Sequence, residues 1–289
     1  MGVAVQARHR DLVAAERMDL RRLRQNITVA WSRRASTADF VRQVALLYSD
    51  KLPTRLKPRQ WTIRFRYPAP IGCVHLHLRS NNGADAFVHS EVFEHQYYRL
   101  PLRFAPATIL DLGANIGLSA IYFARNYPGS RLACVEPVPE NVRLLLRNLK
   151  DNAVEAEVIA AAVDAKDGVV AMERGRADYG HKIAAATPSA AWFEVASVSV
   201  PSILRRLGWA RIGLLKIDIE GHESALLSDA CEWLADVDAL CVEYHHEFAE
   251  AELERLARQF GFLPPTRLPG EIWFLTRPDD FAAPKSVSC

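Results

Sequence analysis

One segment of the chain, residues 214–223, places charged side chains inside an otherwise apolar stretch. Asp218 and Glu220 lie two residues apart, which in a strand puts both side chains on the same side, and His222 follows a glycine. A positioned base contributes roughly 10²–10⁴-fold to the reaction of a weak nucleophile such as a hydroxyl. Because imidazole titrates near neutral pH, we expect His222 to be the base, with Asp218 and Glu220 orienting the reacting groups.

A second pair of polar side chains, Glu243 and His245, ends another apolar run and shares one side of it. His245 is a further candidate base, although it could equally be a polar residue at the end of a strand. A buried lysine needs a partner, so we expect Lys216 to form an ion pair with Asp218 or Glu243, and Glu243 could also orient His245. The candidate catalytic residues are His222, Asp218, Glu220, Glu243 and His245.

Two glycines, Gly113 and Gly117, form a second motif, in which a short apolar run ends in Asp111 and an amphipathic helix follows. A strand, a tight turn and a helix N-terminus are typical of a nucleotide site, where glycine lets the backbone approach a ligand. The middle glycine of the dinucleotide pattern G-x-G-x-x-G is absent. Asp111 would repel a pyrophosphate but could bind a cationic amino-acid moiety, which favours S-adenosylmethionine over NAD. We expect cofactor contacts from Asp111, Gly113, Asn115 and Gly117.

Glu136 ends the next predicted strand. In a nucleotide-binding βαβ unit, an acid roughly 20 residues after the glycine turn accepts hydrogen bonds from ribose hydroxyls. A solvated acid at the end of a strand is the alternative interpretation, but the distance from Gly117 favours the ribose role. Asp218 is a further expected cofactor contact, through the cofactor amino group.

Three blocks of the sequence resemble the FkbM-type S-adenosylmethionine-dependent methyltransferases, and with their spacing they cover roughly residues 86–277. The resemblance implies S-adenosyl-L-methionine as cofactor. It also implies O-methylation of hydroxyls on sugars, polyketides and related metabolites, so the expected partner is a small-molecule or saccharide acceptor. The blocks are residues 111–117, Glu136-Pro137 with Glu140-Asn141, and residues 215–223.

A metal site and two other functions are the alternatives. Asp218, Glu220 and His222 could gather a divalent ion, but the resemblance implies a metal-independent enzyme, so no metal is expected. An NAD-dependent oxidoreductase would need the missing dinucleotide pattern. A non-catalytic nucleoside-binding module would not need the charges of residues 216–223.

The second half of the chain, from about residue 105, alternates strand and helix patterns, which predicts a parallel sheet covered on both faces. The resemblance implies the Rossmann-like α/β fold of class I methyltransferases, with a seven-stranded, mostly parallel sheet and an antiparallel last strand. Ligands bind beyond the carboxyl ends of such strands, so Asp111, Glu136, Asp218 and Glu243 should converge on one site. The predicted strands are residues 108–112, 131–136, 154–161, 214–219, 239–244 and 271–276.

Shorter patterns describe the segments around this domain. Ser36 resembles the N-cap of a helix, and Asn82-Gly83 predicts a hairpin turn after an alternating strand at residues 74–78. Residues 164–200 are polar and loop-like, and could form a lid or a surface loop. The expected division is a helical N-terminal extension (1–55), a hairpin-containing lead-in (56–104), a methyltransferase domain (105–277) and a poorly ordered tail (278–289).

The composition is that of an ordinary enzyme: 289 residues, 49% hydrophobic, with a formal net charge of +2. The predicted catalytic region has no basic stripe interleaved with aromatic residues, so nucleic acid is not favoured as a substrate. No apolar run approaches the ~18 residues that span a bilayer, and the arginine-rich N-terminus lacks the apolar core of a secretory signal. Five cysteines without a C-x-x-C pattern indicate reduced thiols and a cytoplasmic location. The N-terminal helix pattern favours a cap on the substrate pocket or a contact in a homodimer over a membrane-surface helix.

Overall fold

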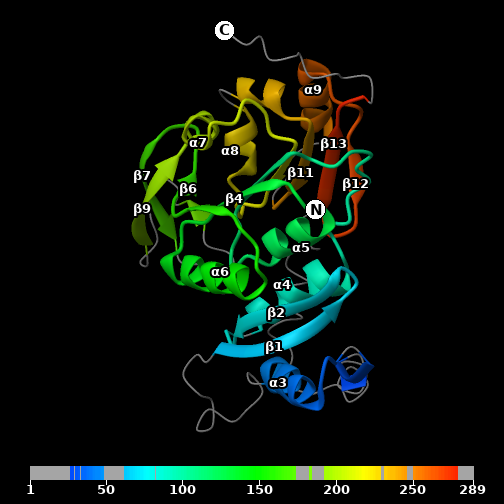
Figure 1. Cartoon of the computed structure of the whole chain (residues 1–289). Helices are drawn as coiled ribbons and strands as arrows, with labels where there is room; N and C mark the ends of the chain where they lie inside the picture. The colour runs from blue at the N-terminus through cyan, green and yellow to red at the C-terminus, as the bar shows by residue number, and fades with distance from the viewer. Residues whose placement is uncertain are drawn as a thin grey trace, which may run out of the picture.

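The computed structural model describes residues 27–28, 30–32, 34–48, 62–81, 83–173, 182–183, 192–228, 231–245 and 250–278. Its centre is a seven-stranded sheet with the order β12-β13-β11-β10-β3-β4-β5 (Figure 1). All neighbouring strands are parallel except β13, which is antiparallel to both β11 and β12. The strands are β3 (Thr108–Leu112), β4 (Arg131–Val135), β5 (Glu157–Ile159), β10 (Leu214–Ile217), β11 (Ala239–Glu243), β12 (Thr266–Leu268) and β13 (Ile272–Thr276).

This topology confirms the Rossmann-like class I architecture. Within this sheet, the chain first forms the central strand β3 and then β4 and β5 on one side of it. It then forms β10 and β11 on the other side of β3. The strand order therefore reverses between β3 and β10, which is the place where open α/β sheets bind their ligands. The short edge strand β12 was not predicted, because three residues carry too little periodicity to be recognised.

Successive strand residues point into two different cores, because side chains alternate across a strand. Ile109 and Leu214 belong to the core that also contains the N-terminal hairpin and residues of α5 (Leu118–Asn126) and α6 (Pro139–Asp151). Leu110 and Leu215 belong to the opposite core. That second face is covered by α7 (Val200–Leu207), α8 (Glu223–Ser228), the 3₁₀ turn η3 (Glu232–Asp236) and α9 (Glu250–Phe260).

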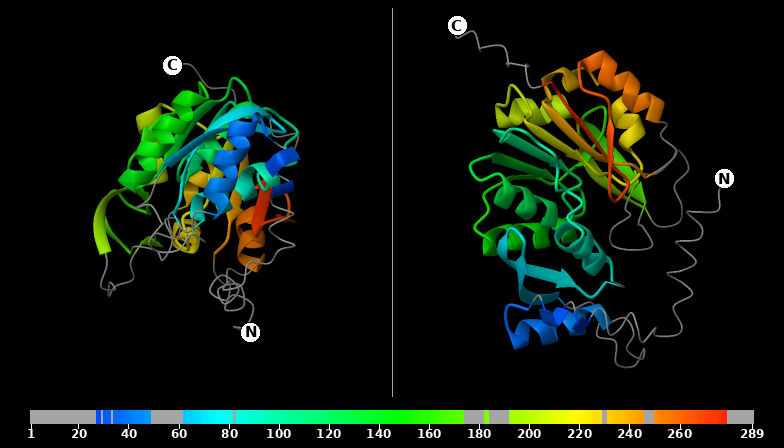
Figure 2. Two further views of the ribbon diagram at one scale, coloured as in Figure 1. Left: turned by 90° about the horizontal axis from the view of Figure 1, so that it is seen from below. Right: turned by 90° about the vertical axis from the view of Figure 1, so that its right-hand side faces the viewer.

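The N-terminal part forms a separate layer at one end of the molecule (Figure 2). Ser36 caps α3 (Thr37–Tyr48) as predicted, since its Oγ accepts a hydrogen bond from Asp39 N at 3.1 Å. The hairpin consists of β1 (Thr62–Ala69) and β2 (Gly72–Arg79), with α3 packed on β1. It is followed by α4 (Ala84–His89) and the π-helical turn η2 (Ser90–Glu94).

The predicted hairpin turn at Asn82-Gly83 is wrong. Gly83 has a φ of 80° and precedes the first residue of α4, and the Asn81 side chain accepts a hydrogen bond from Asp85 N at 2.9 Å. The same glycine conformation that a hairpin turn needs also serves a helix start. The actual hairpin turn lies earlier, between Ala69 and Gly72.

Asn148 of α6 and Asn152, which directly follows this helix, attach the hairpin to the sheet domain. Asn148 accepts a hydrogen bond from His77 N at 2.8 Å and donates to His77 O at 3.2 Å. Asn152 repeats the pattern on His75, with distances of 2.9 and 2.7 Å. His77 also contacts Asp151 through its ring, with Nε2 at 2.8 Å from Oδ2. These side chains thus form hydrogen bonds with the backbone N–H and C=O groups on the open edge of β2, as a neighbouring strand would.

The interpretation of residues 164–200 as a loop is also wrong. They contain most of a second, four-stranded sheet with the order β6-β9-β7-β8, which lies beside α6 and α7 in Figure 1. One side of β9 is only partly buried, so its alternation of exposure gives a weak hydrophobic signal in the sequence. They are β6 (Ala162–Val163), β7 (Gly168–Glu173), β8 (Lys182–Ile183) and β9 (Trp192–Val198).

Among the described residues, no helix is both long and apolar enough to cross a membrane. Residues 1–26, where further N-terminal helix was expected, and the tail from residue 279 lie outside the described part of the chain.

Candidate active site

The carboxyl ends of four central strands bring the predicted site residues to one edge of the sheet. Asp111 lies within β3, Glu136 directly follows β4, Asp218 follows β10 and Glu243 ends β11. These strands are consecutive in the sheet, in the order β11-β10-β3-β4, and each pair of neighbours is parallel. Their carboxyl ends therefore point the same way, and the four acids lie along one edge.

The glycine turn after β3 is shaped by the protein itself. Gly113 and Gly117 have φ values of 79° and 85°, which L-residues rarely adopt. A Cβ on Gly113 would lie 1.8 Å from the backbone oxygen of Asp218, and one on Gly117 would lie 3.2 Å from Leu145 Cγ. A turn with positive φ is one of the two reasons for glycine that the sequence offered, besides approach to a ligand, and the structure confirms it; the residue after β10 and helix α6 also need the space.

Glu136 is buried and holds the loop after β3. Its Oε2 accepts a hydrogen bond from Asn115 N at 3.0 Å, and its Oε1 accepts from Val138 N at 2.9 Å and from Asn141 Nδ2 at 3.1 Å. Burial raises the pKa of Glu136, while these hydrogen bonds and the charge of Lys216 oppose the rise. The predicted solvated alternative is therefore wrong, because only 5% of the residue is exposed.

Two amide oxygens beside Glu136 point to a bound ligand. Asn115 Oδ1 and Asn141 Oδ1 are buried without a hydrogen-bond partner in the protein. Buried polar atoms normally have a partner. Together with the Glu136 carboxylate they form a group of acceptors that fits a ligand rich in hydroxyl or amino donors, such as the ribose and adenine of a nucleoside.

Lys216 is the buried cation that joins the two halves of the site. Its Nζ lies 3.1 Å from Asp111 Oδ1 and 3.2 Å from Asp218 Oδ2, and it donates to Gly113 O at 2.8 Å. Burial alone would lower the pKa of Lys216, but the charges of Asp111 and Asp218 outweigh it and raise the pKa. The predicted ion pair with Asp218 is confirmed, and the pair with Asp111 was not foreseen.

Asp111 differs from its expected role. It is fully buried, and its Oδ2 accepts a hydrogen bond from Ser119 Oγ at 2.6 Å. The cation beside Asp111 is thus Lys216 of the same chain. None of the surface of Asp111 is exposed, so the direct ligand contact that the sequence predicted for it is not available in this structure.

Three side chains form what we call the carboxylate–histidine cluster: Asp218, Glu220 and His245. One ligand atom from each lies within 4.8 Å of the other two. His245 Nε2 is 3.8 Å from Asp218 Oδ1 and 3.6 Å from Glu220 Oε2. Glu220 has a φ of 57°, a strained conformation for a residue with a side chain. Because β10 ends at Ile217, Glu220 joins the cluster from this turn and not from a continued strand.

Glu223 holds the histidine of the cluster in place. It is 1% exposed, and its carboxylate accepts hydrogen bonds from His245 Nδ1 at 3.0 Å, Ile219 N at 3.0 Å and Gly221 N at 2.9 Å. Burial would lower the pKa of His245, but the hydrogen bond to Glu223 and the charges of Asp218 and Glu220 raise it to about 10. The sequence allowed two roles for Glu223, a candidate base or an acid that favours the start of a helix; in the structure it begins α8 and holds His245.

The acids around His245 repel one another. Burial, and next the negative charge of Asp218, raise the pKa of Glu220. The same two causes raise the pKa of Glu243, with a further contribution from Glu91 of η2. Tyr98, which follows η2, donates a hydrogen bond to Asp218 Oδ2 at 3.5 Å. The lead-in segment therefore contributes to the site, and the only signal for it in the sequence was its position just before β3.

His222 lies outside the cluster. Its Nε2 is 2.9 Å from Asp164 Oδ1, at the beginning of the inserted four-stranded sheet. Gly221, with a φ of 96°, turns the chain after Glu220 and sends the two side chains in different directions. His245 therefore occupies the place beside Asp218 and Glu220 that the sequence spacing predicted for His222.

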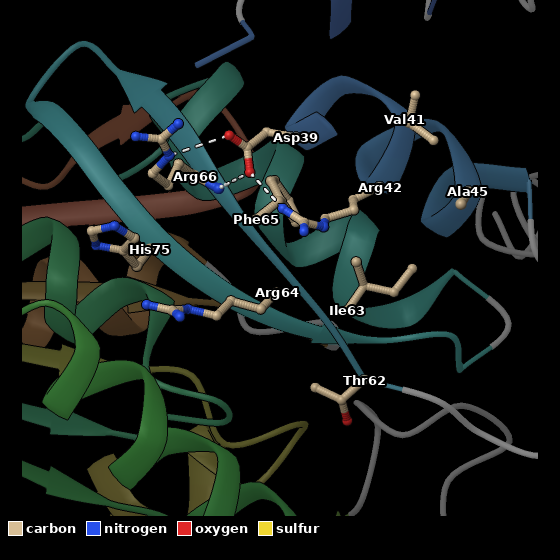
Figure 3. A pocket seen from close by; sticks show the side chains of 10 residues that line it. All are labelled: Asp39, Val41, Arg42, Ala45, Thr62, Ile63, Arg64, Phe65, Arg66 and His75. Carbon is tan, nitrogen blue, oxygen red and sulfur yellow. Dashed lines mark hydrogen bonds and ion pairs between the residues drawn. The ribbon is translucent and has the colours of Figure 1, made fainter. Parts of the chain in front are cut away.

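A cavity of about 630 Å³ lies away from this edge, between α3 and β1 (Figure 3). The charged groups that line it are paired with each other or with α6. Asp39 contacts Arg66 at 3.2 Å and Arg42 at 3.3 Å, and Arg64 contacts Asp151 at 3.0 Å. None of the predicted site residues lines this cavity.

The strand order, the glycine turn and the acid after β4 define a Rossmann-like class I methyltransferase. The family model of the methyltransferase FkbM domain matches residues 111–264. The chain belongs to this family of methyltransferases, and its methyl donor is S-adenosyl-L-methionine. Glu136, Asn115 and Asn141 are the residues that fit the nucleoside part of this donor.

Individual relatives are distant. The chain is 34% identical over 89 residues to methyltransferase sdnD of Sordaria araneosa, a match that covers 31% of this chain and only 30% of that protein. It is 24% identical over 227 residues to the 31-O-demethyl-FK506 methyltransferase FkbM of Streptomyces tacrolimicus, covering 67% of this chain and 86% of the relative. The crystal structure of methyltransferase FkbM from Methylobacillus flagellatus KT superposes with a TM-score of 0.45 and 14% identity, covering 89% of this chain and 60% of the other.

Proposed function

We propose that this methyltransferase transfers the methyl group to a hydroxyl oxygen of a small-molecule acceptor, such as a sugar or a polyketide-type natural product. The observation that carries the proposal is the carboxylate–histidine cluster. It lies at the same sheet edge as the glycine turn and is joined to it by Lys216, which contacts both Asp218 and the carbonyl oxygen of Gly113.

The bound donor supplies an electrophilic methyl carbon on a sulfonium, so the protein has to position the acceptor hydroxyl, which is the nucleophile, and take up its proton. An in-line displacement needs the acceptor atom about 3–3.5 Å from the methyl carbon. Glu136, with Asn115 and Asn141, would hold the nucleoside end of the donor. Gly113 and Lys216 fix the distance from that end to the cluster.

The cluster suits a hydroxyl better than other acceptors. A hydroxyl has to lose its proton as it is methylated, and a carboxylate of the cluster such as Asp218 can bind the hydroxyl and receive that proton. The raised pKa of His245 makes this ring a cation that orients the two carboxylates. A carboxylate acceptor would meet the like charges of Asp218, Glu220 and Glu243. We propose His245 as the histidine of the site in place of His222, because Glu223 fixes its ring toward the two carboxylates.

The relatives support this choice. The Streptomyces tacrolimicus protein is named as a 31-O-demethyl-FK506 methyltransferase, and that name specifies an oxygen acceptor. Membership of a methyltransferase family leaves no support for the two alternatives that the sequence left open, an NAD-dependent oxidoreductase and a non-catalytic nucleoside-binding module.

The test combines binding with product analysis. Calorimetry with S-adenosylhomocysteine should show binding to the wild type and about 10–100-fold weaker binding to Glu136→Gln, the loss expected for hydrogen bonds to a charged group. Methyl-labelled donor should then be incubated with pairs of acceptors that differ only in a hydroxyl or an amine. Label in an ether linkage would support the proposal, whereas label found only on nitrogen or carbon would overturn it.

A further inference from the structure

The carboxylate–histidine cluster has the composition and spacing of a metal site. Its three ligand atoms come from the end of β10, the strained turn after it and the end of β11, and they lie within 4.8 Å of one another. About a quarter of each side chain is exposed, 23% for Asp218, 29% for Glu220 and 25% for His245. An ion could therefore enter from solvent and still be enclosed on its protein side.

The contact between His245 and Glu223 is an independent observation that points to an ion. Metal-binding histidines usually donate the second ring nitrogen to a carboxylate, which fixes the ring and makes the ligand nitrogen more basic. Here Nδ1 donates to the buried Glu223, and Nε2 faces Asp218 and Glu220. Glu223 in turn is held by backbone N–H groups of the turn, so the orientation of the ring is determined before any ligand binds.

Lys216, the protein's own cation beside the cluster, leaves one carboxylate oxygen of Asp218 free to bind an ion. An ammonium group has three donors, and Lys216 directs them at Asp111, Gly113 O and Oδ2 of Asp218. Oδ1 of Asp218 is left for the cluster, where its distance from His245 Nε2 is 3.8 Å. Glu243 adds a further carboxylate near Asp218 and His245. The negative charges of this edge thus exceed the positive charge that Lys216 contributes.

The distances are suitable for a small divalent ion. For metal–ligand bonds of about 2.1 Å, ligands in adjacent octahedral positions lie about 3.0 Å apart and opposite ligands about 4.2 Å apart. The separations of 3.6 and 3.8 Å from His245 Nε2 exceed the spacing of adjacent ligands by less than 1 Å, so the side chains have to draw together slightly to bind one ion. These separations are too long for direct hydrogen bonds.

We propose that Asp218, Glu220 and His245 bind a divalent cation of the Mg²⁺ or Mn²⁺ type, which holds the oxygen atoms of the acceptor. Two carboxylates and one imidazole suit such an ion, and its remaining coordination positions face the acceptor side of the cluster. The cluster then holds the hydroxyl through the ion, whose charge makes the hydroxyl more acidic. This inference rests on the proposed function and departs from the expectation, drawn from the resemblance, that the enzyme needs no metal.

The experiment is a titration of the EDTA-treated full-length protein with Mn²⁺, following the paramagnetic resonance signal of the free ion. The wild type should bind one ion per chain. Glu220→Gln and His245→Asn should each weaken Mn²⁺ binding about tenfold or more, since even the loss of an outer partner costs 10–100-fold. His222→Asn is the matched control, because this histidine lies two residues from Glu220 but contacts Asp164, and it should leave Mn²⁺ binding unchanged.

Binding of S-adenosylhomocysteine to the same EDTA-treated samples separates this inference from the proposed function. If the cofactor product binds and Mn²⁺ does not, or if His222→Asn weakens Mn²⁺ binding as much as His245→Asn does, the metal site is refuted and the methyltransferase proposal stands. If Mn²⁺ binds at the cluster but labelled methyl is transferred equally well in EDTA, the ion has no part in holding the acceptor. If folded protein binds no cofactor product, the proposed function itself fails.

Discussion

Two polar regions of this protein are built on opposite principles. At the junction of β2 with α6, Asn148 and Asn152 each match one N–H and one carbonyl group of the hairpin edge. At the carboxyl ends of β10 and β11, the carboxylates of Asp218, Glu220 and Glu243 crowd around His245 and Lys216 instead. One region pairs neutral groups completely, and the other gathers like charges.

The difference teaches where this fold is stabilised and where it is prepared for a ligand. Complete pairing of buried neutral groups stabilises an interface without leaving anything for a ligand to satisfy. Like charges held close together cost free energy unless a cation or a proton joins them. The junction is thus a structural contact between the N-terminal hairpin and the sheet domain, while the cluster is arranged for chemistry. Four changes test this comparison.

The largest effect is expected from changing the histidine of the cluster. His245→Asn should lower kcat/KM for methyl transfer by roughly 10²–10⁴-fold, because it removes the group that Glu223 aims at Asp218 and Glu220. His222→Asn should lower it far less. Affinity for S-adenosylhomocysteine should change much less than kcat/KM in both, since neither histidine is among the hydrogen-bond partners of Glu136. Equal losses of kcat/KM in the two variants would contradict the assignment of His245 to the site.

The second largest effect is expected on the stability of the fold, from replacing the buried Lys216. Lys216→Met leaves the fully buried Asp111 carboxylate without its cation. We expect the free energy of unfolding to fall by about 3–5 kcal/mol, as for other buried pairs that lose one member. Urea denaturation measures this, with the exposed Lys150→Met as control. Adding Asp111→Asn to Lys216→Met should recover part of the loss, and no recovery would show that the cost has another origin.

Removing an asparagine from the junction between β2 and α6 should destabilise the protein mainly around β2. Asn148→Ala leaves His77 N, His77 O and Ile116 O without a partner in a buried place, which costs about 1–3 kcal/mol. Asn126→Ala, which removes one bond at the end of α5, is the control. Hydrogen exchange should speed up in β2 while β3 and β4 stay protected. Faster exchange across the whole sheet would mean that the junction also supports the sheet domain.

The smallest effect concerns pH. The hydrogen bond with His77 lowers the pKa of Asp151 below the usual 3.8; burial opposes this, and the charge of Arg64 lowers the pKa further. A carboxyl with a lowered pKa in the folded state adds stability above about pH 4, which is lost as the pH falls through the lowered value. Asp151→Asn should therefore flatten the decrease of unfolding free energy below about pH 4. Thermal denaturation between pH 6 and 3 checks this, and identical slopes for wild type and variant would contradict it.

The sequence was most informative where the signal is local. The run ending in Asp111, the glycine turn and the acid at Glu136 lie within one βαβ unit, so a short stretch of chain fixes their relation. The parallel sheet followed from the alternation of buried strands and amphipathic helices, whereas its seven strands and the antiparallel last strand followed from the resemblance to the family. The inserted sheet was missed because its strands β7 and β9 are largely exposed or only partly buried, which leaves a weak hydrophobic signal in the sequence.

What the sequence determined by itself is the class of fold, the family, the donor and the edge of the sheet at which the chemistry lies. Which histidine belongs to the site, which group neutralises Asp111, and why Gly113 must be glycine were decided by the tertiary structure. The physical reason is that Glu220 and His222 are neighbours in sequence but separated by a left-handed turn, whereas His245 reaches Glu220 from the adjacent strand. Contacts between parallel strands depend on how the sheet is assembled, and no spacing along the chain encodes them.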